Sequence, residues 1–421
     1  MECNDVYKLE KQVMRICKNI LFVIISIIFF VGCDKTTTIY INDYEATTSI
    51  NELLFCTVDI NIVNNNRGDD VTSLLQNYLN ECDNVIIPEG EYSITKSLAL
   101  TKKGQIIEGI NASSTIIWND SNMSENSVIG KSTFIAFNTD ITIRNLSIFG
   151  DQISLDGGIQ ELSGTGHGIV FDGMYGMINR DRFNCNLENL IIKNGYNGIT
   201  IQNGEGYCNI KDVNISNCHH GLQLLNTNNI NVENYNYKSE VFRSSNGWSK
   251  RPLTMHSGVK DINLKNISIE GGQISPIYIR IEDNNDTNER INIENVNIIG
   301  NEYTYTGIYF HNSSTNGGEI KDINITNLNI SNVKNAIMLD GASQNYSKYT
   351  SNIRINKYIA FNVTNVFQHS SFLYPYTIGF NNFFLSDSEF FSNGGRLKGE
   401  NIYLKDIVYH DVEINIQEIY E

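Results

Sequence analysis

The sequence of 421 residues predicts an all-β fold, a single-stranded parallel β-helix (a solenoid) that begins with an N-terminal capping helix. Three observations predict this fold. A strand motif with an Asn or Asp at its centre recurs along most of the chain. A second, shorter apolar strand follows the copies of this motif. A single segment with convincing helical spacing precedes the repeats.

The first 32 residues have the pattern of a signal peptide. A basic stretch precedes an apolar run over 20–31, and its basic residues are Lys8, Lys11, Arg15 and Lys18. The run is too short for a membrane-spanning helix, which needs ~20 residues, but it fits the apolar region of a signal peptide. We therefore expect an exported protein.

The apolar run ends in Phe30-Val31-Gly32-Cys33, which resembles a bacterial lipobox with Phe in place of the usual Leu. The resemblance implies a lipoprotein, in which residues 1–32 are removed and Cys33 is lipidated. The protein is then expected in the bacterial cell envelope, at the outer membrane or facing the periplasm, with the lipid as its only membrane contact. The alternative is a plain signal peptide that happens to precede a cysteine.

Residues 33–60 are rich in Thr and Asn without a period, and we interpret them as a tether before a β-helix domain over 61–421. Apolar residues at helical spacing follow Asp69-Asp70. They predict a helix over 69–82 with an acidic N-cap, which covers the open end of the solenoid. The repeat weakens in the C-terminal part, where aromatic residues are frequent, so residues from about 365 to 421 are expected to form the last coils and a cap.

The repeats predict how the β-helix domain is arranged. In the long motif, apolar residues alternate with polar ones, which is the period of a strand. The central Asn or Asp recurs every 22 to 32 residues, after a first gap of 44, at positions 145, 189, 212, 234, 266, 295 and 327. The short strands occupy residues 168–171, 198–201, 221–224, 276–279, 307–310 and 336–339. A β-sandwich would not show this translational self-similarity, so we expect coils that stack in parallel.

The stretch over 65–117 resembles the start of the pectate-lyase-like β-helix superfamily. It combines the predicted helix with two short strands around a Pro-Gly turn, NVIIPEGEYSI over 84–94. The resemblance implies a right-handed coil. It is specific for fold and weak for chemistry, because the superfamily holds lyases, hydrolases, epimerases and phage tailspikes. Gly166-His167-Gly168 is similar to a motif of its polygalacturonases, but their Asn-Thr-Asp and paired-Asp signatures do not precede it.

The cysteines predict at most two disulfides. After removal of the signal peptide and lipidation of Cys33, the remaining cysteines are at positions 56, 82, 185, 208 and 218. The odd number leaves at least one thiol outside any disulfide. Cys185 and Cys208 occupy equivalent positions one coil apart, and stacked strands lie ~4.8 Å apart, within reach of a disulfide. The alternative is a pair of buried thiols.

The composition and the absence of certain motifs limit the classes of ligand and cofactor that we expect. The formal net charge of −16 argues against nucleic acid and anionic lipid, and an anionic polysaccharide would need a local basic pocket. The sequence shows no phosphate-binding loop, nucleophile elbow or His/Cys metal cluster, and His219-His220 is interpreted as a surface turn. No cofactor or metal is expected. Ca²⁺ is compatible with the fold but no motif indicates it, and the oligomeric state is left open.

The strand register selects a candidate site. If Ile277 and its alternate neighbours face the core, the outer side chains of successive coils form two rows. These rows are Val170, Thr200, Gln223, Tyr278, Tyr309 and Met338, and beside them Asp172, Gln202, Leu225, Arg280, His311 and Asp340. From Tyr278 and Arg280 onward, the two rows and Glu282 bring together two tyrosines, an arginine, a histidine and two carboxylates. These side chains lie within ~10 Å along the solenoid axis.

These residue types suit chemistry on a polysaccharide. Arg280 could bind a uronate carboxylate while His311, or one of the tyrosines, moves protons in a β-elimination. Alternatively, Glu282 and Asp340 could stand about 6.5–9.5 Å apart as the acid and the base of an inverting hydrolase.

A long insert over 241–257 precedes these coils, and we interpret it as a loop that forms a groove wall. Trp248 and Arg251 in this insert are expected to contact the substrate, as is Asp172. The sequence thus predicts a lipid-anchored β-helix protein that acts on a polysaccharide as a lyase or a glycoside hydrolase. Two alternatives stay open: a non-catalytic glycan-binding or adhesive β-helix, and a solvated face with a ladder of arginine and carboxylate groups.

Overall fold

The computed structural model of the protein describes residues 54–59, 70–119, 132–136, 140–150, 153–156, 159–162, 167–172, 183–239, 251–282, 286–313, 318–341, 350–370, 380–391 and 399–409. All of them lie in one compact unit, Leu53–Glu421. The predicted signal peptide, the lipidation site Cys33 and most of the tether lie outside the described residues.

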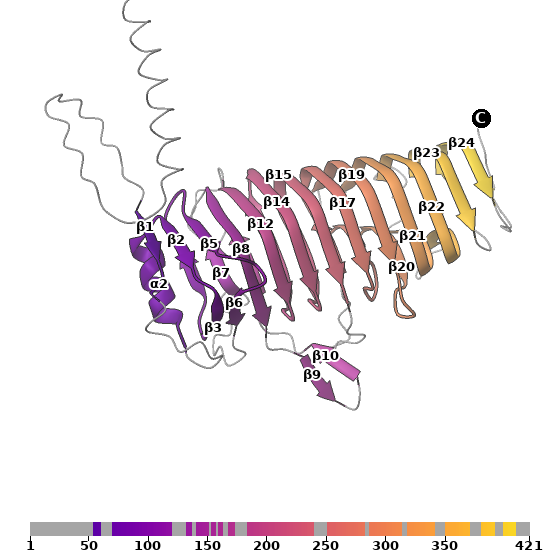
Figure 1. Cartoon of the computed structure of the whole chain (residues 1–421). Coiled ribbons are helices and arrows are strands. Elements are labelled where there is room, and N and C mark those ends of the chain that lie inside the picture. Colours follow the sequence, from indigo (N-terminus) through magenta and orange to yellow (C-terminus); the bar gives the residue numbers. More distant parts are fainter. Residues whose placement is uncertain are drawn as a thin grey trace, which may run out of the picture. The chain divides into compact units, whose positions relative to one another are not determined.

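The compact unit is a solenoid of parallel strands (Figure 1). One 22-stranded sheet runs through it, and its strands pair in parallel from coil to coil. A separate antiparallel pair consists of β9 (Ile153–Asp156) and β10 (Ile159–Leu162). The predicted all-β, parallel β-helix fold is therefore confirmed.

Two faces of the solenoid position the sites described below. The first coils contain β1 (Phe55–Thr57), β2 (Asn84–Ile87), β3 (Gly90–Ile94), β4 (Leu98–Leu100), β5 (Ile106–Gly109) and β6 (Thr115–Asn119). The long-strand face consists of β8 (Ile141–Gly150), β12 (Phe183–Lys193), β14 (Gly206–Ser216), β15 (His220–Lys238), β17 (Lys260–Glu270), β19 (Thr287–Ile299), β21 (Glu319–Gly341), β22 (Thr350–Ser370), β23 (Phe380–Phe391) and β24 (Gly399–Tyr409). The short-strand face consists of β7 (Ser132–Ala136), β11 (His167–Asp172), β13 (Asn197–Gly204), β16 (Arg251–His256), β18 (Ile277–Ile281), β20 (Thr306–Asn312), the start of β15 and the ends of β21 and β22.

Seven long strands, β8, β12, β14, β15, β17, β19 and β21, bend at the central Asn or Asp of their motif. At the seven positions found in the sequence, this residue has a φ between 51° and 57°. Asn and Asp tolerate this left-handed conformation better than other residues with a side chain. Their amides also stack, since Asn266 Nδ2 donates to Asn234 Oδ1 and Asn295 Nδ2 donates to Asn266 Oδ1, both at 2.9 Å. Bending and stacking together explain why the motif contains Asn or Asp.

The bend also sets which residues enter the core. In β17, Ile262 and Leu264 before the bend and Ile267 and Ile269 after it are all at most 1% exposed. The left-handed residue, Asn266, shifts the alternation by one position. Both halves of the strand therefore bury their apolar side chains in the same core.

The capping helix α2 spans Thr72–Glu81, within the predicted 69–82. Its N-cap is Val71, so the prediction of an acidic N-cap is wrong by one residue. Asp70 nevertheless satisfies a free N–H at the helix start, since its Oδ1 accepts the Thr72 amide at 3.0 Å. Leu75 and Leu79 are each 1% exposed and close the end of the core.

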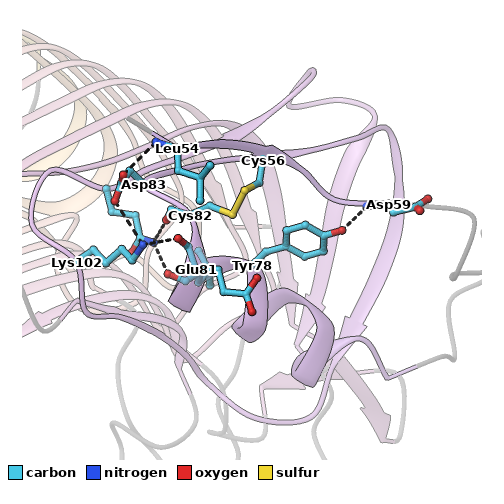
Figure 2. The surroundings of a disulfide bond; sticks show 10 residues. Leu54, Cys56, Asp59, Tyr78, Glu81, Cys82, Asp83 and Lys102 are labelled. Atoms are coloured by element: carbon cyan, nitrogen blue, oxygen red, sulfur yellow. Dashed lines mark hydrogen bonds and ion pairs between the residues drawn. A yellow bond between two sulfur atoms is a disulfide. The ribbon is translucent and has the colours of Figure 1, made fainter. Parts of the chain in front are cut away.

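A disulfide ties the helix to the first strand (Figure 2). Cys82, which follows the helix, is bonded to Cys56 in β1, with the Cα atoms 5.9 Å apart. The Tyr78 hydroxyl accepts a hydrogen bond from the Asp59 amide at 3.1 Å. The sequence did not predict this disulfide, because no repeat relates the two positions.

The second disulfide joins the pair that the repeat had placed together. Cys185 in β12 and Cys208 in β14 are in register and bonded, with the Cα atoms 4.5 Å apart. Cys218 is buried and belongs to neither disulfide.

The histidine pair after β14 is buried, so its interpretation as a surface turn is wrong. His219 is 3% exposed and His220 is 7% exposed. The ring of His219 stacks on that of Tyr196, with centroids 4.7 Å apart. The ring of Tyr196, from the adjacent coil, contacts both histidines and helps to cover the turn.

The loop expected over 241–257 is wrong in its second half. Residues Arg251–His256 form β16, which pairs with β15 on one side and with β18 on the other. An additional coil therefore lies between the coils of Gly221 and Pro276. The sequence did not reveal it because Pro252 follows the preceding central residue, Asn234, by 18 positions, whereas the short strands that open at 198, 221, 276, 307 and 336 follow theirs by 9 to 12.

The bend ladder can be tested at Asn266. We expect Asn266→Ala to lower the free energy of unfolding by about 1–3 kcal/mol, because it strains a left-handed residue and removes two amide contacts. Asn266→Gly, which accepts the same φ, should lose less. Urea denaturation measures both, and equal losses for Ala and Gly would show that the backbone conformation contributes nothing.

Candidate active site

The outer rows of the short-strand face follow the register that the repeats predict. In coil order they are Val170, Thr200, Gln223, Thr254, Tyr278, Tyr309 and Met338, and beside them Asp172, Gln202, Leu225, His256, Arg280, His311 and Asp340. Thr254 and His256 are additions from the extra coil. The alternation of Leu253 and Met255, both fully buried, is the signal that could have revealed it.

The two outer tyrosines form the floor of the site. Tyr278 is 3% exposed and Tyr309 is 9% exposed, and with Met338 they build a small apolar cluster outside the main core. Ile274 and Tyr305, which precede β18 and β20, pack against this cluster. Both tyrosine rings are therefore largely covered, although they lie in the outer row of the face.

His311 is held by both tyrosines. Tyr278 Oη and His311 Nδ1 are 2.6 Å apart, a hydrogen bond whose direction depends on the tautomer of the ring. The His311 ring also stacks on the Tyr309 ring, with centroids 5.3 Å apart and planes inclined by 16°. Because His311 is partly exposed, a titratable group stands at the surface of a buried aromatic cluster.

Glu282 joins two neighbouring coils. Its Oε2 lies 2.8 Å from His256 Nε2, and its Oε1 forms an ion pair with Arg280. The carboxylate thus faces the coil of β16, on the side away from Asp340. The side chain of Asp340 is not described, and the predicted acid–base pair of Glu282 and Asp340 stays a prediction that this orientation does not favour.

Two guanidinium groups flank the ring of Tyr278. The Arg251 Cζ lies 4.3 Å from the ring centroid and the Arg280 Cζ lies 5.9 Å from it. Burial lowers the pKa of Arg280, and so does the charge of Arg251, while Tyr278 and Tyr309 act in the opposite direction. Arginine stays protonated in proteins, so this part of the face is basic although the chain is acidic.

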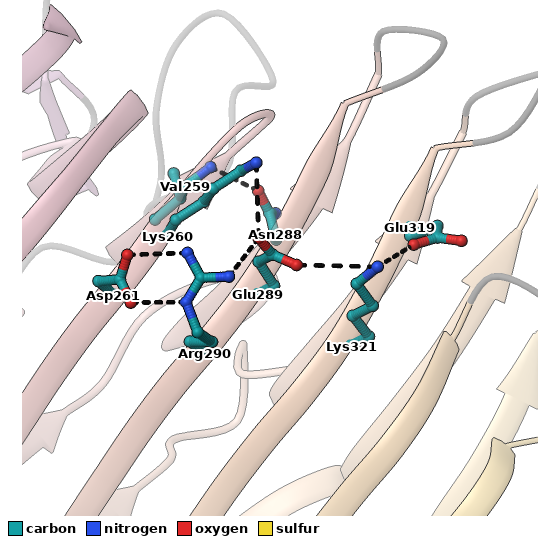
Figure 3. A network of polar contacts seen from close by, with 8 residues as sticks. All are labelled: Val259, Lys260, Asp261, Asn288, Glu289, Arg290, Glu319 and Lys321. Atoms are coloured by element: carbon teal, nitrogen blue, oxygen red, sulfur yellow. Dashed lines mark hydrogen bonds and ion pairs between the residues drawn. The ribbon is translucent and has the colours of Figure 1, made fainter. Parts of the chain in front are cut away.

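The backbone of Arg280 is fixed from two sides. Its carbonyl accepts hydrogen bonds from the Ser257 amide at 2.8 Å and from Asn288 Nδ2 at 2.9 Å. Asn288 is fully buried, and its Oδ1 also accepts the Val259 amide at 2.9 Å (Figure 3). The side chain of Asn288 therefore links two successive coils beneath the site.

A charged network continues from Asn288 across the neighbouring coils (Figure 3). Arg290 binds Asp261 through two contacts of 2.6 and 2.8 Å. Glu289 lies 3.5 Å from Lys260 Nζ and 3.7 Å from Lys321 Nζ. The hydrogen bond from Arg290 lowers the pKa of Asp261, and burial opposes this shift only in part. The network links the starts of β17, β19 and β21 across three successive coils.

Three predicted site residues remain. Arg251 contacts the ring of Tyr278, whereas the roles predicted for Trp248 and Asp172 stay predictions. Trp248 lies outside the described residues, and of Asp172 only its strand position beside Gln202 is described. In the described part of the chain, no three His, Cys, Asp or Glu side chains are grouped as they would be around a metal ion. Among the same residues, no helix is long and apolar enough to cross a membrane.

The comparisons with known proteins rest on structure alone. No family model matches the sequence. No curated protein matches it. The catalytic domain of a GH87 alpha-1,3-glucanase in complex with nigerose is similar at a TM-score of 0.56 and 14% identity, over 87% of this chain and 68% of that chain.

Two further solved structures resemble the chain. The polygalacturonase from Erwinia carotovora ssp. carotovora has a TM-score of 0.53 and 13% identity, over 91% of this chain and all (100%) of that one. The Dettilon tailspike protein has a TM-score of 0.55 and 10% identity, over 80% of this chain and 65% of that one. The chain therefore has the right-handed parallel β-helix fold of pectate-lyase-like proteins, and the likeness extends to the fold alone.

The charged network predicts a pH dependence of stability. Because the pKa of Asp261 is lowered in the folded state, its contribution is present above the unfolded pKa of about 4 and is lost as pH falls through the folded value. We expect Asp261→Asn to lower the melting temperature at pH 7 and to have a progressively smaller effect as the pH falls below about 4. A thermal melt of both proteins across this range measures the difference, and a constant difference would contradict the role of the carboxylate.

Proposed function

We propose that the chain is a polysaccharide-cleaving enzyme that acts on an acidic glycan by β-elimination at the short-strand face. The observation that carries the proposal is the cluster of His311, Tyr278, Arg280 and Arg251 on adjacent coils. It combines an imidazole base with two guanidinium cations on the neighbouring coils. A uronate unit needs both, a base for its ring proton and a positive charge for its carboxylate.

In the proposed reaction, Arg280 binds the carboxylate of the uronate and so makes the C5 proton more acidic. His311 takes this proton, the electron pair forms the C4–C5 double bond, and the bond between C4 and the leaving oxygen breaks. The leaving oxygen takes a proton from water. Arg280 keeps donors for the substrate although it contacts Glu282, because a guanidinium has five N–H groups.

Tyr278 is proposed as a positioning residue for His311. If Nδ1 carries the ring proton and donates it to Tyr278 Oη, then Nε2 is unprotonated and can act as the base. The stacked Tyr309 ring fixes the plane of the imidazole. This assignment explains why both tyrosines are buried beneath the histidine and not exposed beside it.

A second candidate function is hydrolysis of a polysaccharide. The GH87 alpha-1,3-glucanase and the polygalacturonase among the similar structures favour it. The position of Glu282 is less favourable, since this carboxylate is engaged with His256 and Arg280. An unsaturated, ultraviolet-absorbing product identifies a lyase, whereas new reducing ends without that absorbance identify a hydrolase.

The test of catalysis is His311→Ala on a panel of polysaccharides, with polygalacturonate as the first substrate. We expect kcat to fall by about 10²–10⁴-fold with a small change in binding, because a positioned base contributes on this order. Gln202→Ala, in the same outer row but four coils away, is the matched control and should leave kcat unchanged. If no polysaccharide yields product and His311→Ala only weakens binding, the chain is a glycan-binding protein and not an enzyme.

We also propose that Cys33 is lipidated and anchors the protein in the bacterial cell envelope. The lipobox-like end of the signal peptide supports this proposal. In cells fed a labelled fatty acid, we expect the protein to carry the label and to sediment with membranes. Cys33→Ala should lose both properties, and a variant that still carries the label would contradict the assignment.

A further inference from the structure

A second surface, on the long-strand face, also carries a regular set of side chains. Two outward rows follow the first halves of the long strands, in register from coil to coil. One row consists of Asn186, Asn209, Asn231, Asn263, Asn292 and Asn324. The other consists of Glu108, Arg144, Glu188, Lys211, Glu233, Lys265 and Glu294.

The rows line a groove of about 650 Å³. It crosses β8, β12, β14, β15 and β17. Its polar lining comes from Thr142, the first four asparagines of the row and the charged residues from Arg144 to Lys265. The strands of this groove are on the long-strand face, whereas His311 and Arg280 are on the short-strand face. The groove is thus separate from the candidate active site.

The asparagine row offers hydrogen-bond donors and acceptors to a ligand. Asn209 Nδ2 donates to Asn186 Oδ1 at 3.2 Å, and Asn263 Nδ2 donates to Asn231 Oδ1 at 2.9 Å. An amide has two N–H groups and two lone pairs on its oxygen. Within the ladder, Asn209 and Asn263 each use one N–H group and one lone pair. Each of them therefore keeps a second N–H group and a second lone pair for a ligand. A sugar hydroxyl, which both donates and accepts, matches such an array.

An exposed aromatic ring stands beside the row. Tyr207 in β14 is 49% exposed, and Asn231 Nδ2 donates to its hydroxyl at 2.8 Å. The hydrogen bond fixes the ring next to the groove. A large apolar face held open to water in this way is a feature of binding sites, and its flat shape fits the face of a pyranose ring.

The charged row selects for a neutral ligand. Arg144, Glu188, Lys211, Glu233 and Lys265 alternate in sign along the solenoid. Arg144 also forms an ion pair with Glu108 of the same row, so the charges of the row cancel along the groove. A uronate polymer or a nucleic acid would gain no net attraction there. The spacing of ~4.8 Å between equivalent side chains favours an extended ligand with a repeat along the axis.

We propose that this groove is a second glycan-binding site, which holds a neutral, extended polysaccharide along the axis with one sugar ring on Tyr207. The site would hold the protein on a polymer while the short-strand face acts on its own substrate. The binding proposal does not depend on the proposed β-elimination, because no residue is shared between the two surfaces.

The test is affinity electrophoresis of the full chain in gels that contain dextran, laminarin or galactomannan, with polygalacturonate as the charged comparison. We expect retardation by at least one neutral polymer. Tyr207→Ala should raise the Kd for that polymer by at least about tenfold, whereas Tyr207→Phe, which keeps the ring, should change it by less than about threefold.

Two controls separate the groove from other surfaces. Tyr303→Ala removes another exposed tyrosine, 40% exposed and outside the groove, and should leave binding unchanged. His311→Ala should also leave it unchanged, so failure of the catalytic proposal is distinguishable from failure of this one. The proposal is overturned if no neutral polymer retards the protein, if Tyr207→Ala binds like Tyr303→Ala, or if His311→Ala abolishes binding. Equal melting temperatures of the variants would exclude a loss of fold.

Discussion

The structure depends on the left-handed Asn or Asp at the centre of the long strands from β8 to β21, whose side chain stacks on its counterpart in the next coil. At Asn266 the backbone bends, the alternation shifts, and the side chain bonds to Asn234 and Asn295. A coil that slipped by one residue would lose the bend, the ladder and the burial of its apolar positions together. The parallel register is therefore strongly specified, and it carries every outer side chain to a fixed place beside its counterpart.

This register gives the two faces different chemistry from the same architecture. On the long-strand face, like residues stack on like in the asparagine row, and opposite charges alternate in the row beside it. On the short-strand face the repetition breaks at β16, β18 and β20, where Arg251, His256, Arg280 and His311 occur on successive coils. A break in a repeat brings unlike groups into contact, and contact between unlike groups is what acid–base chemistry requires.

The fold and the outer rows could be predicted from the sequence because both are properties of the repeat. What the sequence did not reveal lies outside the repeat. The coil of His256 was not recognised because residues 239–250 separate its short strand from the preceding long strand. The burial of Tyr278 depends on Ile274 and Tyr305, which come from turns with no period. The Cys56–Cys82 disulfide joins the cap to the first strand, where no coil precedes to relate the two positions.

The net charge of −16 is a weaker guide to the substrate than the position of a few groups. At physiological ionic strength, exposed charges more than about 8 Å away are largely screened, so most of the acidic surface contributes little at the site. Arg280 is partly buried and Arg251 lies on an aromatic ring, and charges in such places are screened less. A carboxylate that approaches Tyr278 would therefore interact mainly with the two guanidinium groups and with Glu282, which neutralises part of the charge of Arg280, and only weakly with the distant acidic groups of the chain. The proposed uronate specificity follows from this local field, and the acidic remainder of the surface would limit the rate of approach more than the strength of binding.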